Sequence, residues 1–414
     1  MENIFLFLFL LLIPTQLGRH FWPDWSMVNG IRVDYLAPTL YLVDLVWLGW
    51  MGTKSITNYE LLITNWKKIF SFRNLIILLF VGVNIVLAGN RWEAGYKWVR
   101  IGQWAITFGI FKLQSSNFNI KKMLEWIIPC WVVVEAFLVV GQVVMGHNVG
   151  GIFYWLGERR FSFNTIGIAQ MSWWGNGVVR AYGTFSHPNS LAGFTLISWL
   201  LWSRYQNLQS SNFNLQKKTI WWVVNWLMIL IMVLAGSRIV WLILLAKLLI
   251  TNYQLLITNK KKKIGWGVAV VGMILILVGY LGNKGNQGIL GGWDTESLSK
   301  RLELNLVALG MIKENPLFGV GAGNFLNKLP EYQQAYRFYW LQPVHNIFLL
   351  AWSEVGSLGI IIAIQLLITN YELRIKDKTR FWIIGAVLVT GMVDHYWLTL
   401  PQNSWLLAVV FSMI

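Results

Sequence analysis

Long apolar runs separated by short polar connections extend over the whole chain. Most of these runs are about 17 to 23 residues long, the length that a helix needs to cross a hydrocarbon core of about 30 Å. They lie near residues 4–16, 35–51, 74–90, 97–113, 123–145, 188–203, 219–235, 238–250, 264–281, 346–368, 381–399 and 403–414. The pattern predicts an all-α, polytopic membrane protein with about twelve transmembrane helices in a single transmembrane domain, residues 1–414.

Charged residues make up only 13% of the chain, about half of the share that is usual in a soluble protein. Lysines and arginines that contribute to the net charge of +16 gather in short connections near residues 54–73, 112–122, 204–218, 260–263 and 374–380. Because basic loops of membrane proteins stay in the cytoplasm, twelve helices with both termini inside would place all five connections on that side. This topology explains the basic balance without a nucleic-acid partner, which would require a basic patch on a soluble module.

The first apolar run, FLFLFLLLIP, is interpreted as a membrane helix rather than a cleaved signal peptide. Glu2 stands where a signal peptide has a basic region, and no small-residue cleavage site follows the run. Cys130 is the only cysteine, so neither an intramolecular disulfide nor a cysteine-based zinc site can form. The five histidines do not have metal-ligand spacing on one helix, and nothing in the sequence demands a metal or another cofactor.

Near-copies of two peptides recur along the chain. One occurs as NYELLITN at 58–65, NYQLLITN at 252–259 and LLITNYEL at 366–373, and the other as SSNFNIKK at 115–122 and SSNFNLQKK at 210–218. Their spacing is irregular, which excludes a solenoid, and all of them fall in or beside connections assigned to the cytoplasm. We interpret them as tolerant connectors, so function is expected on the opposite face.

Two long connections face outward in this topology, residues 146–187 and 282–345. Ordered loops of this length usually carry function. The first ends in RAYGTFSHPNSLAGF, in which His187 and Asn189 flank a proline that opens the next helix. The free N–H groups of a helix start suit a phosphate, and Arg180 would add a bidentate clamp; the alternative is a capped helix beside an interfacial arginine.

Arg238 lies in AGSRIVW, a tight connection between two apolar runs at the outer membrane surface. An arginine at membrane depth costs a few kcal/mol and therefore indicates function, unless its side chain reaches the interface by snorkelling. The intramembrane acids Asp44 and Glu135 are candidate partners for the arginines.

The second outward connection contains an amphipathic helix that would lie against the membrane surface or the bundle. Its leucines recur at helical spacing, at Leu298, Leu302, Leu306 and Leu309. Its polar face carries Lys300, Arg301 and Glu303. The GVGAGNF stretch that follows has no GK[ST] and no preceding strand, so it predicts a tight turn rather than a nucleotide-binding loop.

His345 stands at the mouth of the tenth apolar run and is a candidate general base, although a lone histidine is more often structural. Glu354 follows nine residues later, about 180° around a helix, so the two do not form an acid–base pair on one face. We expect Glu354 to pair with a neighbouring helix.

Four segments combine these residues into a pattern. They are R-x-x-G-T-F-x-H-P-N from Arg180, G-S-R ending at Arg238, N-P-L-F-G-V-G-x-G-N-F from Asn315, and H-N-x-x-L-x-x-x-x-E-x-G-x-x-G from His345. In order, spacing and topology, over about residues 30–400, the chain resembles the O-antigen ligase and O-antigen polymerase superfamily of polytopic membrane glycosyltransferases.

The resemblance implies a GT-C-like fold in the inner (cytoplasmic) membrane with an extracytoplasmic active site. It implies transfer of a glycan from an undecaprenyl-diphosphate carrier to a hydroxyl of a glycan, lipid or protein acceptor, as in lipopolysaccharide and other envelope polysaccharides. Matched residue by residue, Arg180 and Arg238 would hold the donor diphosphate and His345 would deprotonate the acceptor. The further substrate-binding candidates are Arg301, His187, Asn189, Asn346 and Glu354. The simplest chemistry is a metal-independent, inverting single displacement.

Two other functions remain open at this point. A polysaccharide polymerase of the same superfamily would use another lipid-linked glycan as acceptor, and the motifs do not distinguish it from a ligase. A lipid-linked glycan transporter or flippase would show inverted hydropathy repeats and matching broken helices, which the sequence lacks. The motifs name neither the sugars nor the oligomeric state.

Overall fold

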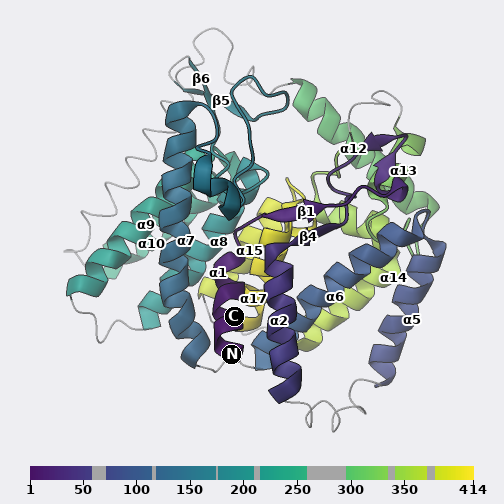
Figure 1. The fold of residues 1–414 in the computed structure, drawn as a ribbon, viewed down its shortest axis with the longest axis horizontal. Coiled ribbons are helices and arrows are strands. Elements are labelled where there is room, and N and C mark those ends of the chain that lie inside the picture. The colour runs from purple at the N-terminus through teal and green to yellow at the C-terminus, as the bar shows by residue number, and fades with distance from the viewer. Residues whose placement is uncertain are drawn as a thin grey trace.

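The structure is a computed structural model that describes residues 1–57, 71–113, 118–173, 176–208, 215–258, 295–333, 341–370 and 378–414. Within these ranges the chain is predominantly helical (Figure 1). The helices are α1 (Glu2–Leu12), α2 (Leu42–Thr57), α5 (Phe72–Leu87), α6 (Arg91–Leu113), α7 (Phe118–Met145), α8 (Pro188–Leu208), α9 (Leu215–Leu234), α10 (Arg238–Thr258), α12 (Thr295–Glu314), α13 (Phe325–Tyr332), α14 (Ile347–Asn370), α15 (Lys378–Gly391), α16 (Tyr396–Thr399) and α17 (Pro401–Met413).

The expected all-α membrane fold agrees with these helices. Every predicted apolar run overlaps one of them except the run at 264–281, which lies outside the described residues together with the basic segment at 260–263. Among the described helices, two are long and apolar enough to cross a membrane, Lys122–Met145 and Ile347–Thr369. The count of twelve spans and the GT-C-like arrangement stay predictions.

Two predicted helix boundaries are wrong. The run at 35–51 becomes helical only at Leu42, because residues 39–41 form a strand instead. The run at 381–399 is divided: α15 ends at Gly391, a turn follows, and the short α16 begins at Tyr396. Both errors have one cause, because apolar composition does not show where a helix ends and the backbone takes another conformation.

Three short two-stranded antiparallel sheets lie between the described helices. β1 (Gly18–His20) pairs with β4 (Thr39–Tyr41), and β2 (Met27–Val28) pairs with β3 (Ile31–Arg32) beside the 3-10 helix η1 (Asp24–Ser26). The connection between α7 and α8 holds the 3-10 helix η2 (Gly151–Leu156) and the hairpin of β5 (Gln170–Trp173) with β6 (Asn176–Val179). In Figure 1 the β5–β6 hairpin, α12 and α13 lie at one end of the molecule, and both termini lie toward the opposite end.

The largest hydrophobic core joins α1, α2, α7, α8, α9, α10, α15 and α17. Large aromatic side chains fill its centre, and Phe9 lies edge-on to Trp405 with ring centroids 5.2 Å apart. Residues 1–12 and 401–413 therefore contribute to one core although they are the two ends of the sequence. This packing brings the last segments of the chain beside α8 and α6, where they contribute to the site described below.

A second core packs α12 and α13 against α14 and the N-terminal connection. The predicted helix in the second outward connection is present as α12, and the residues that pack it against the protein are not those of the leucine stripe. Leu304, Val307 and Met311 are buried, whereas Leu302 and Leu306 are more than half exposed. The leucine stripe seen in the sequence thus faces away from the bundle.

The glycine-rich segment forms a tight turn, as the sequence predicted, and it fills a break in α14. Gly356 has φ +64°, so the helix is interrupted there and nearby carbonyl groups lose their helical partners. Val320 donates its N–H to the carbonyl of Ser353 (2.8 Å), and Gly321 donates to that of Glu354 (3.0 Å). A broken helix at membrane depth is tolerated where neighbouring protein satisfies its backbone, and the turn does this for α14.

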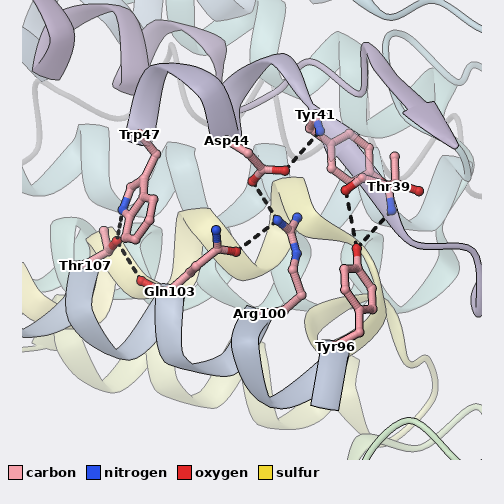
Figure 2. Close-up of polar contacts among 8 residues, drawn as sticks. All are labelled: Thr39, Tyr41, Asp44, Trp47, Tyr96, Arg100, Gln103 and Thr107. Carbon is pink, nitrogen blue, oxygen red and sulfur yellow. Dashed lines mark hydrogen bonds and ion pairs between the residues drawn. The ribbon is translucent and has the colours of Figure 1, made fainter. Parts of the chain in front are cut away.

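A buried ion pair connects α2 to α6 (Figure 2). Arg100 Nη1 lies 2.6 Å from Asp44 Oδ1 and also donates to Gln103 Oε1 (3.0 Å). Asp44 Oδ2 in turn accepts the backbone N–H of Tyr41 (2.9 Å), which fixes the start of α2. Asp44 therefore has a partner on α6, not one of the outward arginines that the sequence suggested.

Replacing Asp44 by alanine would leave the Arg100 guanidinium buried without its counter-ion. Removing one partner of a buried ion pair typically costs about 3–5 kcal/mol of stability. We expect Asp44→Ala to lower the unfolding temperature of the detergent-solubilised protein markedly, as measured by tryptophan fluorescence during heating.

The pair between Lys54 and Glu2 provides the control, because its side chains are 17% and 29% exposed. Glu2→Ala should cost at most about 1 kcal/mol, and Asp44→Leu combined with Arg100→Met should recover most of the loss. Equal effects of the two single variants would contradict this account.

Candidate functional site

Several segments that are far apart in the sequence meet where α8 begins. Arg180 follows strand β6, and His187 and Asn189 belong to the start of α8. Asp394 and His395 lie in the turn between α15 and α16. His345, which precedes α14, completes the cluster, and its ring centroid is 5.1 Å from that of His395.

A chain of hydrogen bonds connects Arg180 to Asp394. Arg180 Nη2 donates to Asn189 Oδ1 (2.5 Å), and Asn189 Nδ2 donates to Asp394 Oδ2 (2.8 Å). Arg180 Nε also donates to the carbonyl of Ala235 (2.9 Å), at the end of α9. These bonds fix the plane of the Arg180 guanidinium and couple its position to that of the Asp394 carboxylate.

Three imidazoles surround the Asp394 carboxylate. Its Oδ1 accepts the backbone N–H of His395 (2.8 Å), and His395 Nδ1 lies 2.7 Å from Thr399 Oγ1. His187 Nδ1 accepts the backbone N–H of Asn189 (3.2 Å). His345 Nδ1 is buried and has no hydrogen-bond partner, in contrast to the other two rings. The Nδ1 atoms of His187 and His395 are thus bonded within the protein, whereas that of His345 is not.

Burial decides the charge state of these histidines. It lowers the pKa of His187 to about 4 and that of His395 to about 3, although the Asp394 carboxylate opposes the shift in both cases. Burial also lowers the pKa of His345 below the usual value for histidine, again against Asp394. At neutral pH all three imidazoles are therefore neutral, and a neutral imidazole can accept a proton.

Asp394 keeps its negative charge in the same surroundings. Burial alone would raise its pKa, but the positive charge that the nearby imidazoles carry once acid protonates them, together with the hydrogen bond from Asn189, outweighs this and holds the pKa at about 2. Tyr35 lies edge-on to His395 with ring centroids 5.3 Å apart. The pKa of the Tyr35 hydroxyl is raised, mainly by burial and secondly by the charge of Asp394. The buried Asp394 carboxylate thus acts on Tyr35 as well as on the three imidazoles.

The two other predicted arginines lie at the edge of the cluster. Arg238 is the first residue of α10, and its side chain is exposed. It lies about one turn after Ala235, whose carbonyl accepts the hydrogen bond from Arg180. Arg301 on α12 is half-buried and lies close enough to His187 and His345 for its charge to lower the pKa of both. Arg180 and Arg301 therefore act on the neutral histidines as positive charges, and Arg238 lies about one turn after the residue that Arg180 contacts.

A cavity of about 470 Å³ opens beside the cluster. His187 contributes to its wall, as do Thr399, the partner of His395, and Tyr35. The remaining wall comes largely from polar residues of the N-terminal connection, α6 and the two outward connections, which include His20, Asp34, Tyr96, Lys97, Arg100, Arg159 and Gln342. Such a lining, with many hydrogen-bonding groups, is suited to a hydroxylated ligand more than to an apolar one.

Two of the predicted substrate-binding residues have other contacts. Asn346 Oδ1 accepts the backbone N–H groups of Phe348 (2.9 Å) and Leu349 (3.1 Å), so the side chain caps α14. The Glu354 carboxylate accepts backbone N–H groups of the glycine-rich turn and faces Lys97 on α6, which agrees with the expected pairing to a neighbouring helix. The structure does not bring Glu354 into the histidine cluster.

Glu135, like Asp44, is bonded to a partner other than an outward arginine. Its carboxylate accepts both the backbone N–H and the hydroxyl of Thr184, and this fixes the turn that follows Arg180. A side chain at Gly183, which has φ +56°, would collide with the same carboxylate, so the glycine of the G-T-F segment is required by this contact. Glu135 therefore supports the site indirectly.

Sequence reasoning missed Asp394, His395 and Tyr35. A signal existed for Asp394, because it is an acid inside the apolar run predicted at 381–399, and charged residues at such positions indicate function by default. Among the described residues, the histidines and acids do not form a group that could hold a metal ion. The oxygens of Asp394 are already bonded to Asn189 and to the His395 backbone.

Residues 223–364 match the family model described as O-antigen ligase. The match confirms the resemblance to the O-antigen ligase superfamily and supports a membrane enzyme of the O-antigen ligase or polymerase type. It includes Arg238, Arg301 and His345, whereas Arg180 and Asp394 lie outside it. No curated protein and no solved structure matches the chain.

The charge of Asp394 gives the first prediction for the site. Because this carboxylate raises the pKa of His187 and of His345 against burial, Asp394→Asn should lower both pKa values further. An NMR titration of imidazole signals in detergent micelles would measure the shift.

Glu331→Gln is the matched control, since it exchanges an exposed carboxylate on α13 for the same amide. It should leave the titration of the clustered histidines unchanged. A rise in the pKa of His187 or His345 in Asp394→Asn would show that the carboxylate does not act on these rings.

Proposed function

We propose that this chain is a membrane glycosyltransferase of the O-antigen ligase type, which transfers a glycan from an undecaprenyl-diphosphate carrier to an acceptor hydroxyl on the extracytoplasmic face. One observation supports this most directly: Arg180, predicted from sequence to bind a diphosphate, is connected through Asn189 to a carboxylate that lies among His187, His345 and His395. An anion-binding group and a candidate base thus meet beside a polar cavity.

The charges of the cluster suit a diphosphate. Arg180 and Arg301 are positive, the three imidazoles are neutral at neutral pH, and the Asp394 carboxylate lies among them. A diphosphate that enters beside these two arginines would find attractive partners. Preorganised cations that face a leaving group stabilise the charge that develops on it in the transition state.

His345 is the proposed general base. Its Nδ1 is buried without a partner and its pKa is lowered, so the ring is neutral and able to accept a proton. The acceptor hydroxyl transfers its proton to His345 while its oxygen attacks the anomeric carbon of the donor sugar. The new carbon–oxygen bond forms as the bond to the lipid diphosphate breaks, in a metal-independent, inverting single displacement. His345 then returns the proton to the solvent.

The location of the site agrees with an extracytoplasmic reaction in the inner membrane. The cluster is built from residues at helix ends, and it lies on the connections that the charge distribution assigns to the outside. The partners in this proposal are the lipid-linked glycan, a glycan, lipid or protein hydroxyl, and the membrane lipids. Both termini would be cytoplasmic.

A polysaccharide polymerase of the same superfamily remains the second candidate, because the same residues would serve a lipid-linked acceptor. Products that form a ladder of increasing length would favour the polymerase, and a single addition would favour the ligase. Liposome flux of the lipid-linked glycan without transfer would favour a flippase instead.

The proposal is tested by transfer assays with purified enzyme and lipid-linked donor. We expect Arg180→Ala and His345→Ala to reduce the transfer rate by roughly 10²–10³-fold, the loss that follows removal of an electrostatic stabiliser or a general base. Arg238→Ala should reduce transfer as well.

Arg160→Ala and His147→Ala are the controls, since both residues are exposed on the first outward connection and do not line the cavity. They should transfer at the wild-type rate. Wild-type rates in Arg180→Ala, Arg238→Ala and His345→Ala together would refute the assignment of the site.

The pH dependence tests the role of His345 separately. A base must be deprotonated to act, and the pKa of His345 is lowered from the usual value, so the transfer rate should be flat through neutral pH. It should fall only on the acid side of about 6.5, the ordinary value for histidine. A rate that already declines from pH 8 to pH 7 would exclude His345 as the group that controls this limb.

A further inference from the structure

A second hollow lies at the outer end of α6, separate from the cavity beside the histidines. The connection between α5 and α6 (Ala88, Gly89, Asn90) and the first residues of α6 line one part of it, and α13 lines the rest. The volume of about 620 Å³ lies in the range of about 300–1,000 Å³ that is typical of ligand clefts. We call this hollow the α6–α13 groove.

The base of the α6–α13 groove is held rigidly. The Asn90 backbone N–H donates to Asn324 Oδ1 (2.7 Å), and Asn324 Nδ2 donates back to the Asn90 carbonyl (3.1 Å). Asn90 Nδ2 also donates to the carbonyl of Trp25 (2.6 Å). Lys328 packs so closely on Gly89 that a side chain there would meet its Cε at 2.9 Å. A preformed base of this kind lowers the ordering cost of binding a ligand.

The walls of the groove combine an aromatic face with amide and charged groups. Trp92 is 74% exposed, and Asn327 Nδ2 is buried without a hydrogen-bond partner. A buried donor without a partner is unfavourable, and a bond to a ligand hydroxyl would remove this cost. Aromatic rings bind the apolar faces of sugar rings, while amides bond their hydroxyls, so the walls have the two kinds of group that a saccharide needs.

The charge of the groove favours an uncharged ligand over an anionic lipid headgroup. Lys328 Nζ lies 2.8 Å from Glu331 Oε1 and 3.0 Å from Oε2, so the two charges on α13 compensate each other. A headgroup site would instead present uncompensated cations. Arg91 is the one remaining charge among the residues that line the groove, and its Nε donates to the carbonyl of Val86 (3.1 Å), so the groove lacks the cluster of cations that a headgroup site presents.

The groove and the reaction cavity share one helix. Arg91 and Trp92 line the groove, and Glu93, Tyr96 and Lys97 line the cavity. Trp92 and Lys97 are about 8 Å apart along the axis of α6, at about 1.5 Å per residue. The two residues are also about 140° apart around the helix, at about 3.6 residues per turn, so a chain of sugars that occupies both hollows would bend around the start of α6.

We propose that the α6–α13 groove is a distal glycan subsite, which binds an uncharged stretch of the saccharide several sugars away from the reacting end. The proposal rests on the proposed function, because it takes the glycan to be the substrate of the adjoining cavity. It adds a role for Trp92 and Asn327: they increase the affinity for long chains without contacting the reacting atoms.

Direct binding tests the subsite without transfer. The probe is the glycan released by mild acid from the carrier lipid of the same cells, separated by gel filtration into single-repeat and multi-repeat fractions. Saturation-transfer NMR with the detergent-solubilised protein should detect the multi-repeat fraction, and Trp92→Ala should weaken its binding by roughly tenfold, the upper range for one aromatic contact. Trp126→Ala is the control, because Trp126 is 66% exposed on α7 and lines neither hollow.

Trp92→Phe and Asn327→Ala keep the test decisive if Trp92→Ala does not fold. Trp92→Phe retains an aromatic face and should bind more tightly than Trp92→Ala, while Asn327→Ala should weaken binding by several-fold. Wild-type protein that does not bind the multi-repeat fraction, or Trp92 and Asn327 variants that bind it as wild type does, would overturn the proposal. An effect of Trp92→Ala confined to anionic-lipid binding in phosphatidylglycerol nanodiscs would overturn it in favour of a headgroup site.

Transfer assays separate this inference from the proposed function. With multi-repeat glycan, Trp92→Ala should raise KM and leave kcat unchanged, and with single-repeat glycan neither constant should change. Equal losses for both lengths would contradict a distal subsite. Absence of transfer by the wild-type enzyme with retained binding in the groove would refute the proposed function and leave the subsite standing.

Discussion

The charge of Asp394 is the constraint around which the outward end of the molecule is organised. A carboxylate buried in protein costs several kcal/mol unless hydrogen bonds and opposite charges compensate it. Here the compensation comes from Asn189, from the His395 backbone and, through Asn189, from Arg180. Each partner belongs to a different segment, so satisfying one buried charge draws the start of α8, the end of β6 and the turn after α15 to one point.

The same constraint determines the chemistry that the cluster can perform. Burial keeps the three imidazoles neutral, while the carboxylate opposes further loss of their basicity. Arg180 and Arg301 act on the same histidines as positive charges. This combination of neutral base and positive charge is suited to an anionic leaving group and a hydroxyl nucleophile, and it supports glycan transfer from a lipid diphosphate as the proposed reaction.

Rigid supports outside the cluster maintain its geometry. The break in α14 at Gly356 is bonded to the glycine-rich turn, and Glu354 holds that turn while it faces Lys97 on α6. The ion pair of Asp44 with Arg100 ties α6 to α2 in turn. Helix α6, which lines one wall of the reaction cavity, is thereby fixed at several points. Its first residues also line the α6–α13 groove. A site held by helices on several sides can keep substrate groups in register more precisely than a site on a free loop.

The sequence by itself determined the helical membrane class and the position of most helices, and it singled out Arg180, Arg238, Arg301 and His345 as candidates, because apolar periodicity, basic loops and motif order are local properties of the chain. It did not reveal that Asp394 is the common partner, that α15 ends before it, or that α12 packs through Leu304 rather than Leu302. Those features depend on which segments lie side by side, and a contact between residues about 200 positions apart, such as Asn189 with Asp394, exists only after packing. Only the tertiary structure could decide which of the predicted residues share a site.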